Sequence, residues 1–578
     1  MSKNVGALLL DTRSIQKYIF MSNKLKTNIG ASYLVKKIFD DLVIQTVDEI
    51  GLKMPEIAWD SPENKDIQMK QDNSIQCEIV YIGGGKILML VNKDGEEHLQ
   101  TAKNIVRKWT KKVLLYAPGL KTGAAIGELD ISDEHPDVFV QGLDELTKQL
   151  KANQSRIIPI VDIPYSGLTL ECDYTGKTAD IDDRILKEYY YNMAEGRKIS
   201  SEVAAKIIAC SYSQEELIKR NEVSEILQNK FIFADELENI GYKKAAVGSN
   251  LSIDNGVGEP GESYISVVHI DGNNMGAKFS GVETSQEYKE LSLAVEHKVR
   301  KAFAKLLDSI ISEFGKYDGY LDFEKMYDSD GKCTLPIRPI IIGGDDITFI
   351  CPGRLGITYA ERLIKFINEE PLLTKDQQKK MKKKAGCQIN DKMSCCAGIA
   401  IVTAEYPFFR AYELAEQACS VAKKNSRKDD SSWLEFVILH GESSPELADL
   451  REAQYHGVEG NLHYGPYQLE GTKPDSVTGL IKLSRALMVN EIPSSCIKGL
   501  RDALTKDAHN MIVFLRTENC KKLRELVKTL KNLKDEKDVT YNHLWENDKS
   551  GKSTRYIDAI EIMKFIIPEL YEVEEAAQ

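Results

Sequence analysis

Apolar positions along the chain follow two kinds of pattern. Short runs of branched apolar residues predict buried strands, as at residues 265–270 and 340–342. Other stretches carry apolar residues three or four positions apart, which predicts helices with one buried face, and residues 286–308 are the clearest example. Between residues 261 and 445 the order is strand, helix, strand, turn and strand, followed by a further strand and helix. This order predicts a palm domain, a ferredoxin-like sheet with helices on one side.

The N-terminal part of the chain repeats this pattern with changes. Residues 5–10 predict a strand that ends on Asp11, and residues 78–91 predict two strands joined by glycines. Gly85 and Lys86 stand in this hairpin where the later hairpin carries two aspartates. A glycine and a lysine cannot hold a cation, so we expect this copy to be catalytically inactive. The alternative is two unrelated α+β segments that share common turn residues.

The remaining segments are mostly helical in pattern, and 578 residues are too many for one core. Leucines at helical spacing predict a bundle near the C-terminal end. The predicted fold class is therefore α+β, with two ferredoxin-like palm domains, a helical middle region and a C-terminal helical bundle. The predicted domains are a degenerate palm over 1–130, a mixed helical or linker domain over 131–260, an active palm over 261–445 and a C-terminal helical domain over 446–578.

The sequence GGDD at residues 343–346 places two like charges side by side between two predicted strands. Adjacent carboxylates repel each other and lose hydration when a site closes, unless a divalent cation lies beside them. Asp271, at the end of an earlier strand, supplies a carboxylate from a second direction, as metal-dependent phosphoryl transfer requires. We therefore predict that Asp271, Asp345 and Asp346 are catalytic and bind Mg²⁺ or Mn²⁺. The alternative is an exposed hairpin with two solvated aspartates.

Residues around these carboxylates are candidates for holding a nucleotide. An amphipathic helix after Pro407 ends with Lys423 and Lys424, and either lysine could neutralise a triphosphate. Cations in the last turn also suit the helix dipole, which is the alternative reason for them. The predicted nucleotide-binding residues are Gly272, Asn273, Gly343, Gly344, Lys423 and Lys424.

Three segments together resemble a known family. The sequences HIDGNNMG around Asp271, GGDD at 343–346 and YPFFRAYELAEQACSVAKK at 406–424 are similar to the active palm domain of the large polymerase-cyclase subunit of type III CRISPR effector complexes. They are similar, more distantly, to diguanylate cyclases. Relatives often carry a second aspartate two positions after the first, where this chain has Asn273, so that residue departs from the pattern of a metal ligand.

The resemblance implies both a fold and a function. It implies one degenerate and one active palm, with a C-terminal helical domain that docks other subunits. It implies nucleotide cyclisation or oligomerisation in antiviral defence, in which ATP is converted to cyclic oligoadenylate or a related cyclic nucleotide. Other effector subunits, guide RNA and target RNA are the implied partners. The chain contains no His-Asp dipeptide, so we expect a form without the family's N-terminal His-Asp nuclease domain.

Composition limits the other possibilities. The net charge of −12 gives no general attraction to nucleic acid, so RNA contact would need a local basic face or a basic partner. No apolar run approaches a membrane span, and the 11 scattered cysteines lack the paired spacing of a zinc site. We expect a cytoplasmic protein with no membrane association.

Two functions remain. The chain could be a cyclase, or it could be a catalytically silent palm-fold scaffold subunit of an RNA-guided ribonucleoprotein complex. Intact Asp271, Asp345, Asp346 and Lys423 favour the enzyme, because a scaffold has no reason to keep crowded carboxylates.

Overall fold

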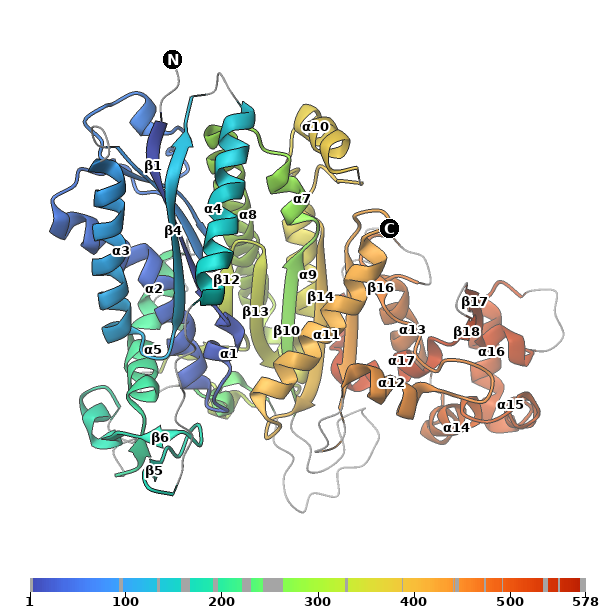
Figure 1. The fold of residues 1–578 in the computed structure, drawn as a ribbon. Helices are drawn as coiled ribbons and strands as arrows, with labels where there is room; N and C mark the ends of the chain where they lie inside the picture. Colours follow the sequence, from blue (N-terminus) through green and yellow to red (C-terminus); the bar gives the residue numbers. More distant parts are fainter. Residues whose placement is uncertain are drawn as a thin grey trace.

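Two sheets lie side by side, and a helical region adjoins the second sheet (Figure 1). The coordinates are a computed structural model. It describes residues 4–92, 97–132, 136–156, 167–190, 196–220, 230–242, 264–327, 331–386, 388–439, 441, 446–471, 475–490, 492–533, 539–548 and 551–571. The predicted boundary between residues 260 and 261 lies outside these residues.

The first sheet is antiparallel and has the strand order β2-β3-β1-β4. Its strands are β1 (Asn4–Arg13), β2 (Cys77–Gly83), β3 (Lys86–Val91) and β4 (Lys121–Asp130). Alternate residues of β1 belong to different cores, as the period of two in a strand requires. Leu8 and Leu10 pack with helices α2 (Leu25–Ile50) and α3 (Glu97–Tyr116). Ala7 and Leu9 pack with α4 (Pro136–Arg156) on the other face.

The second sheet has the order β12-β13-β10-β14-β15-β16, and only the β14–β15 pair is parallel among its described pairs. Its strands are β10 (Tyr264–Gly272), β12 (Arg338–Gly343), β13 (Asp346–Pro352), β14 (Cys395–Thr403), β15 (Trp433–Ile438) and β16 (Tyr467–Gln468). The helices between these strands are α7 (Met275–Ser280), α8 (Ser285–Ser312), α9 (Gly356–Asn368), α10 (Lys375–Ala385) and α11 (Phe408–Ser426).

The first sheet and the first four strands of the second sheet have the same strand order, and both contain a β-bulge at the same place. The outer strand of each hairpin shifts register just before the glycine turn, between Ile79 and Tyr81 in β2 and between Pro339 and Ile341 in β12. Such bulges are specific features of a fold. The matching bulges therefore support the predicted duplication.

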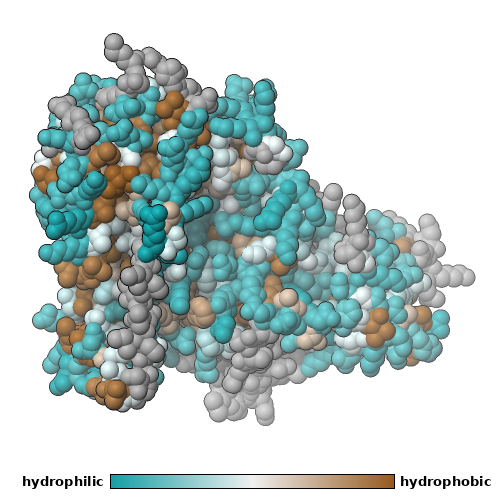
Figure 2. Space-filling view, viewed as in Figure 1, coloured by the Kyte–Doolittle hydropathy of each residue, from teal (hydrophilic) through white to brown (hydrophobic). Residues whose placement is uncertain are grey.

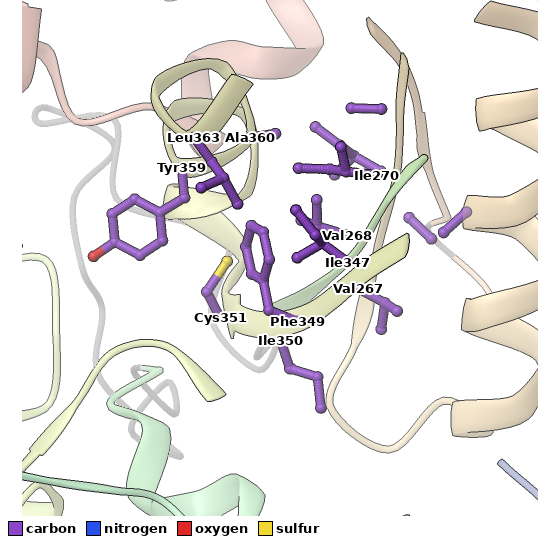
Figure 3. Packing of buried hydrophobic residues seen from close by; sticks show 14 of the residues in the cluster. Val267, Val268, Ile270, Ile347, Phe349, Ile350, Cys351, Tyr359, Ala360 and Leu363 are labelled. Atoms are coloured by element: carbon purple, nitrogen blue, oxygen red, sulfur yellow. The ribbon is translucent and has the colours of Figure 1, made fainter. Parts of the chain in front are cut away.

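Helices cover both faces of the second sheet, so the expectation of helices on one side is wrong. Side chains of β10 and β13 such as Val268 and Phe349 lie toward α9 in Figure 3. Gly398 pairs with His269 in the sheet, and His269 points to the opposite face from its neighbour Val268. A Cβ on Gly398 would lie 1.9 Å from the carbonyl oxygen of Ala415 in α11, so α11 covers that opposite face. The parallel β14–β15 pair needs a crossover helix, and α11 is that helix.

The middle region packs on the first palm. Helix α5 (Ser201–Arg220) lies so close to α2 that a Cβ on Gly30 would come within 1.6 Å of the Lys206 carbonyl oxygen. Helix α4 also extends the first palm beyond residue 130.

The shorter elements of the two palms and the middle region are α1 (Ile15–Ile19), β5 (Leu170–Glu171), β6 (Thr178–Ala179), β7 (Ile181–Asp182), β8 (Lys198–Ile199), β9 (Phe231–Phe233) and β11 (Cys333–Leu335).

The C-terminal region is helical, as predicted. Its elements are α12 (Leu447–Tyr455), α13 (Val477–Val489), α14 (Ser494–Leu504), α15 (Ala508–Leu515), α16 (Lys521–Leu530), α17 (Tyr556–Ile562) and the hairpin of β17 (Glu546–Asp548) and β18 (Gly551–Ser553). Figure 2 shows a mostly hydrophilic face, with hydrophobic residues gathered over the first palm. In the described residues no helix is both long and apolar enough to cross a bilayer.

His463 joins the C-terminal region to the second palm through buried ion pairs. Its Nδ1 atom lies 2.8 Å from Asp558 Oδ1 in α17, and its Nε2 atom lies 2.7 Å from Glu435 Oε1 in β15. Burial and Arg451 both disfavour the charged ring, but Asp558 and Glu435 outweigh them and raise the pKa of His463 to about 9.

We expect this junction to weaken as the pH rises. The folded-state pKa of His463 lies above its ordinary value of 6.5, so its stabilisation is complete below about pH 6.5 and is lost as the pH rises through about 9. His463→Gln should therefore lower the melting temperature strongly at pH 6 and much less at pH 9.5. Calorimetry at both pH values tests this, and an equal loss at both would contradict the charged-ring account.

Candidate active site

Two neighbouring strands bring the predicted carboxylates together. Branched residues from Ile265 to Ile270 form β10, and Asp271 near its end pairs in register with Asp346 at the start of β13. The backbone amide of Gly272 donates to the Asp345 carbonyl oxygen at 3.1 Å. A Cβ on Gly272 would lie 2.7 Å from the Asp345 Cβ, so only glycine allows this approach. Asp271 and Asp346 thus meet at one end of the sheet although they lie far apart in the chain.

The crowding changes the acidity of the turn carboxylates. Burial, followed by the charge of Asp271, raises the pKa of Asp345 and of Asp346 to about 7. Lys423 opposes both shifts. The Oδ1 atom of Asp346 is buried and has no hydrogen-bond partner. Burial and crowding therefore favour the neutral forms of both carboxyl groups unless a cation lies beside them.

Lys423 and Lys424 occupy different environments. The Lys423 ammonium donates to the Asp271 carboxylate, and although burial lowers the pKa of Lys423, Asp271 raises it by more. Lys424 is exposed and lines a separate cavity beside α12, together with Glu435 and Arg451. Adjacent residues of a helix point about 100° apart, which is why only Lys423 reaches the carboxylates.

The other predicted binding residues have mainly backbone roles. Asn273 is buried, and its side chain donates to the Ser431 carbonyl oxygen at 3.2 Å. Gly344 has a φ of +59°, which favours glycine, and Gly343 ends β12. Asn273, Gly343 and Gly344 thus shape the backbone of the turn and the strand end, and none of them has a charged side chain.

Sequence reasoning missed two neighbours of the site. His269 lies with Nδ1 3.5 Å from Asp346 Oδ1, and burial lowers its pKa. The period of two along β10 could have placed it on the face of Asp271. Lys278 is fully buried and donates to the Asn273 carbonyl oxygen at 3.0 Å, with Asp430 3.6 Å away. No local signal links Lys278 to Asp430.

The first palm keeps the geometry of this site but not its charge. Asp11 pairs in register with Lys86, at the position where Asp271 pairs with Asp346. Gln154 of α4 donates to Asp11 Oδ2 at 2.7 Å, much as Lys423 of α11 contacts Asp271. Each palm therefore presents a strand-end carboxylate to the helix that follows its fourth strand.

The two glycine turns face each other. A Cβ on Gly344 would lie 3.9 Å from the backbone nitrogen of Gly84 in the first palm. Phe20 of the first palm also stacks on Tyr412 of α11, with ring centroids 4.1 Å apart. The end of β10 that carries Asp271 thus lies near the junction of the two palms.

The donor atoms at this site suit a hard divalent cation. They are all carboxylate oxygens, and the buried Oδ1 atom of Asp346 has no hydrogen-bond partner. Among the residues that the structure describes, no group of three or more His, Cys, Asp or Glu side chains stands ready to hold a metal ion. The Lys423 ammonium contacts the Asp271 carboxylate.

Comparison with known proteins identifies the second palm. Residues 264–432 match the family model of Cas10/Cmr2, second palm domain, which confirms the resemblance found in the sequence. No curated protein matches the chain. Among solved structures, a Csm1–Csm4 cassette in complex with cA4 is 13% identical, over 98% of this chain and 70% of that chain, with a TM-score of 0.44. The apo Csm1–Csm4 cassette has 13% identity, the same coverage and a TM-score of 0.45. Csm1 in T. onnurineus has 12% identity, the same coverage and a TM-score of 0.44.

Proposed function

We propose, starting from the match of residues 264–432 to the Cas10/Cmr2 second palm domain, that the chain is a nucleotidyl cyclase of a type III CRISPR effector complex. It would join ATP into a cyclic oligoadenylate, with a ribose hydroxyl of one nucleotide attacking the α-phosphate of another and pyrophosphate leaving. The observation that carries the proposal is the meeting of Asp271, Asp345 and Asp346 beside Lys423.

Each residue has a distinct part in this reaction. Asp271, Asp345 and Asp346 would hold Mg²⁺ or Mn²⁺, which when bound supplies charge neutralisation and lowers the pKa of the attacking hydroxyl. Lys423 would leave Asp271 for the triphosphate and compensate its charge. The facing glycine turn of the first palm would border the acceptor nucleotide, because a single palm contacts only one side of the reacting pair.

A silent scaffold is the second candidate, and the first palm of the same chain is its best comparison. There the partner of the strand-end carboxylate is Lys86, which removes the crowding of like charges. Burial raises the pKa of Asp11 as well, but no carboxylate in the described part of the chain is among the causes of that shift. In the second palm, by contrast, the charge of Asp271 adds to burial and raises the pKa of Asp345 and of Asp346 further. Such a cost to stability is typical of functional sites, and this favours the enzyme.

The direct test is to incubate the purified chain with Mg²⁺ or Mn²⁺ and each nucleoside triphosphate, alone and with its effector partners and target RNA. Mass spectrometry of the products should show cyclic oligoadenylate from ATP. Absence of any nucleotide product under all of these conditions would favour the scaffold.

Replacing Lys423 should weaken ATP use while replacing its neighbour should not. Lys423→Met removes a charged donor worth about 1.5–3 kcal/mol, so we expect KM for ATP to rise roughly 10- to 100-fold. Lys424→Met is the matched control, because that side chain is exposed on another side of α11. Steady-state kinetics of both variants test this. Equal increases in KM for ATP would show that Lys423 has no specific part in nucleotide binding.

A further inference from the structure

A buried glutamate holds the turn between the two catalytic strands. Glu296 of α8 is 4% exposed, and its Oε2 atom accepts a hydrogen bond from the backbone amide of Gly344 at 3.0 Å. Gly344 lies in the turn, next to Asp345, in a left-handed conformation. A hydrogen bond from an amide to a carboxylate is about twice as strong as one between neutral groups.

Glu296 is in turn fixed by the first palm. One helical turn later on α8, the Arg300 Nη2 atom lies 3.0 Å from Glu296 Oε1. The Nη1 atom of Arg300 lies 3.0 Å from Asp60 Oδ2, in the segment between α2 and β2. His297 Nε2 lies 2.7 Å from the Asp60 carbonyl oxygen. Asp60, Arg300, Glu296 and Gly344 thus form a continuous series of polar contacts from the degenerate palm to the catalytic turn.

A second contact that tethers this turn, in addition to the backbone bond from Gly272 to the Asp345 carbonyl oxygen, has a physical reason. Asp345 and Asp346 repel each other and Asp271, which pushes the turn away from β10. Two consecutive glycines give the turn little stiffness of its own. Placing another carboxylate nearby adds negative charge, so electrostatics alone does not explain Glu296, whereas its hydrogen bond to Gly344 does.

We infer that Glu296 is a positioning residue, which holds the 343–346 turn in place and makes the degenerate palm part of its support through Arg300 and Asp60. The catalytic half of this inference rests on the proposed function. The tether itself does not.

Hydrogen exchange tests the tether without any need for activity. In Glu296→Ala, exchange in a peptide covering residues 341–349 should become roughly tenfold faster or more, because the amide of Gly344 loses its acceptor. Glu296→Gln keeps an acceptor oxygen and should exchange at an intermediate rate. Asp60→Asn should give a smaller increase, since it loosens only the far end of the series.

Glu361→Ala is the matched control. Glu361 is also a buried helical glutamate with a cation four residues later, Lys365 at 3.0 Å, but it lies on α9. Its loss should cost similar stability without changing exchange at residues 341–349. Unchanged exchange in Glu296→Ala, or an equal change in Glu361→Ala, would overturn the inference.

Kinetics tests the catalytic half. Where the wild type makes product, Glu296→Ala should lower kcat about tenfold or more with KM for ATP within about twofold, and Glu296→Gln should partly restore kcat. Faster exchange with unchanged kcat would show a tether that catalysis does not need, which overturns the positioning role. If the wild type makes no product, the proposed function fails separately, and the exchange comparison alone decides whether Glu296 holds the turn.

Discussion

Replacement of both Asp345 and Asp346 by asparagine will abolish nucleotide turnover and leave the folded protein at least as stable as the wild type. Activity should fall by at least about 1,000-fold, because the neutral amides cannot hold a divalent cation or balance its charge. Stability should not fall, because burial and the Asp271 carboxylate already disfavour the charged forms of both side chains. Opposite effects on activity and stability are typical of a functional site and separate it from a structural one.

The measurement pairs an ATP-turnover assay with a melting curve at one fixed pH. Asp11→Asn is the control, because it removes the carboxylate at the same strand position in the first palm, where Lys86 stands opposite. We expect that variant to retain turnover within about tenfold, a loss below 1.4 kcal/mol in activation free energy. Full turnover by the double asparagine variant would show that the Asp345 and Asp346 carboxylates take no part in the reaction.

Gly398→Val will disrupt the second palm. A Cβ on Gly398 would lie 1.9 Å from the Ala415 carbonyl oxygen and 2.3 Å from the Cys419 nitrogen, so β14 and α11 cannot keep their present separation. Alanines at positions 411, 415, 418 and 422 allow the same close approach from the helix side. We expect a loss of about 4 kcal/mol or more, at the upper end of single-residue effects. Displacement of α11 would also move Lys423 from Asp271.

Thermal unfolding and nucleotide binding measure this effect together. Gly276→Ala is the matched control, because a Cβ there meets nothing within 4 Å, and its φ is not in the left-handed range. That substitution should leave the melting temperature nearly unchanged or raise it slightly. Equal melting temperatures for the two variants would show that α11 does not pack against Gly398 as described.

The duplication and the two strands that carry Asp271 and Asp346 could be predicted from the sequence because their signals are local. Short runs of branched and other apolar residues define β10 and β13, and the GGDD sequence at residues 343–346 marks the hairpin between β12 and β13. The same reasoning aligned Lys86 with Asp346, and the strand register bears that alignment out. A turn and two adjacent strands need only near neighbours in the chain, so the residue pattern suffices.

Contacts between distant segments could not be predicted in this way. Helical periodicity alone did not decide between Lys423 and Lys424, because either lysine satisfies the same amphipathic pattern. The covering of both sheet faces also escaped prediction, since it depends on the parallel β14–β15 pair and on the space left by Gly398. Gln154 was missed because the first palm was expected to end before α4.

The sequence by itself determined which residues could carry the chemistry, Asp271, Asp345 and Asp346, and where the chain must turn to present them. Only the tertiary structure decided what surrounds them, including the contact of Lys423 with Asp271 and the bond from Gly344 to Glu296. The physical reason is that strand and turn preferences act over a few residues. The position of a helix on a sheet depends instead on packing between segments that are remote in the chain.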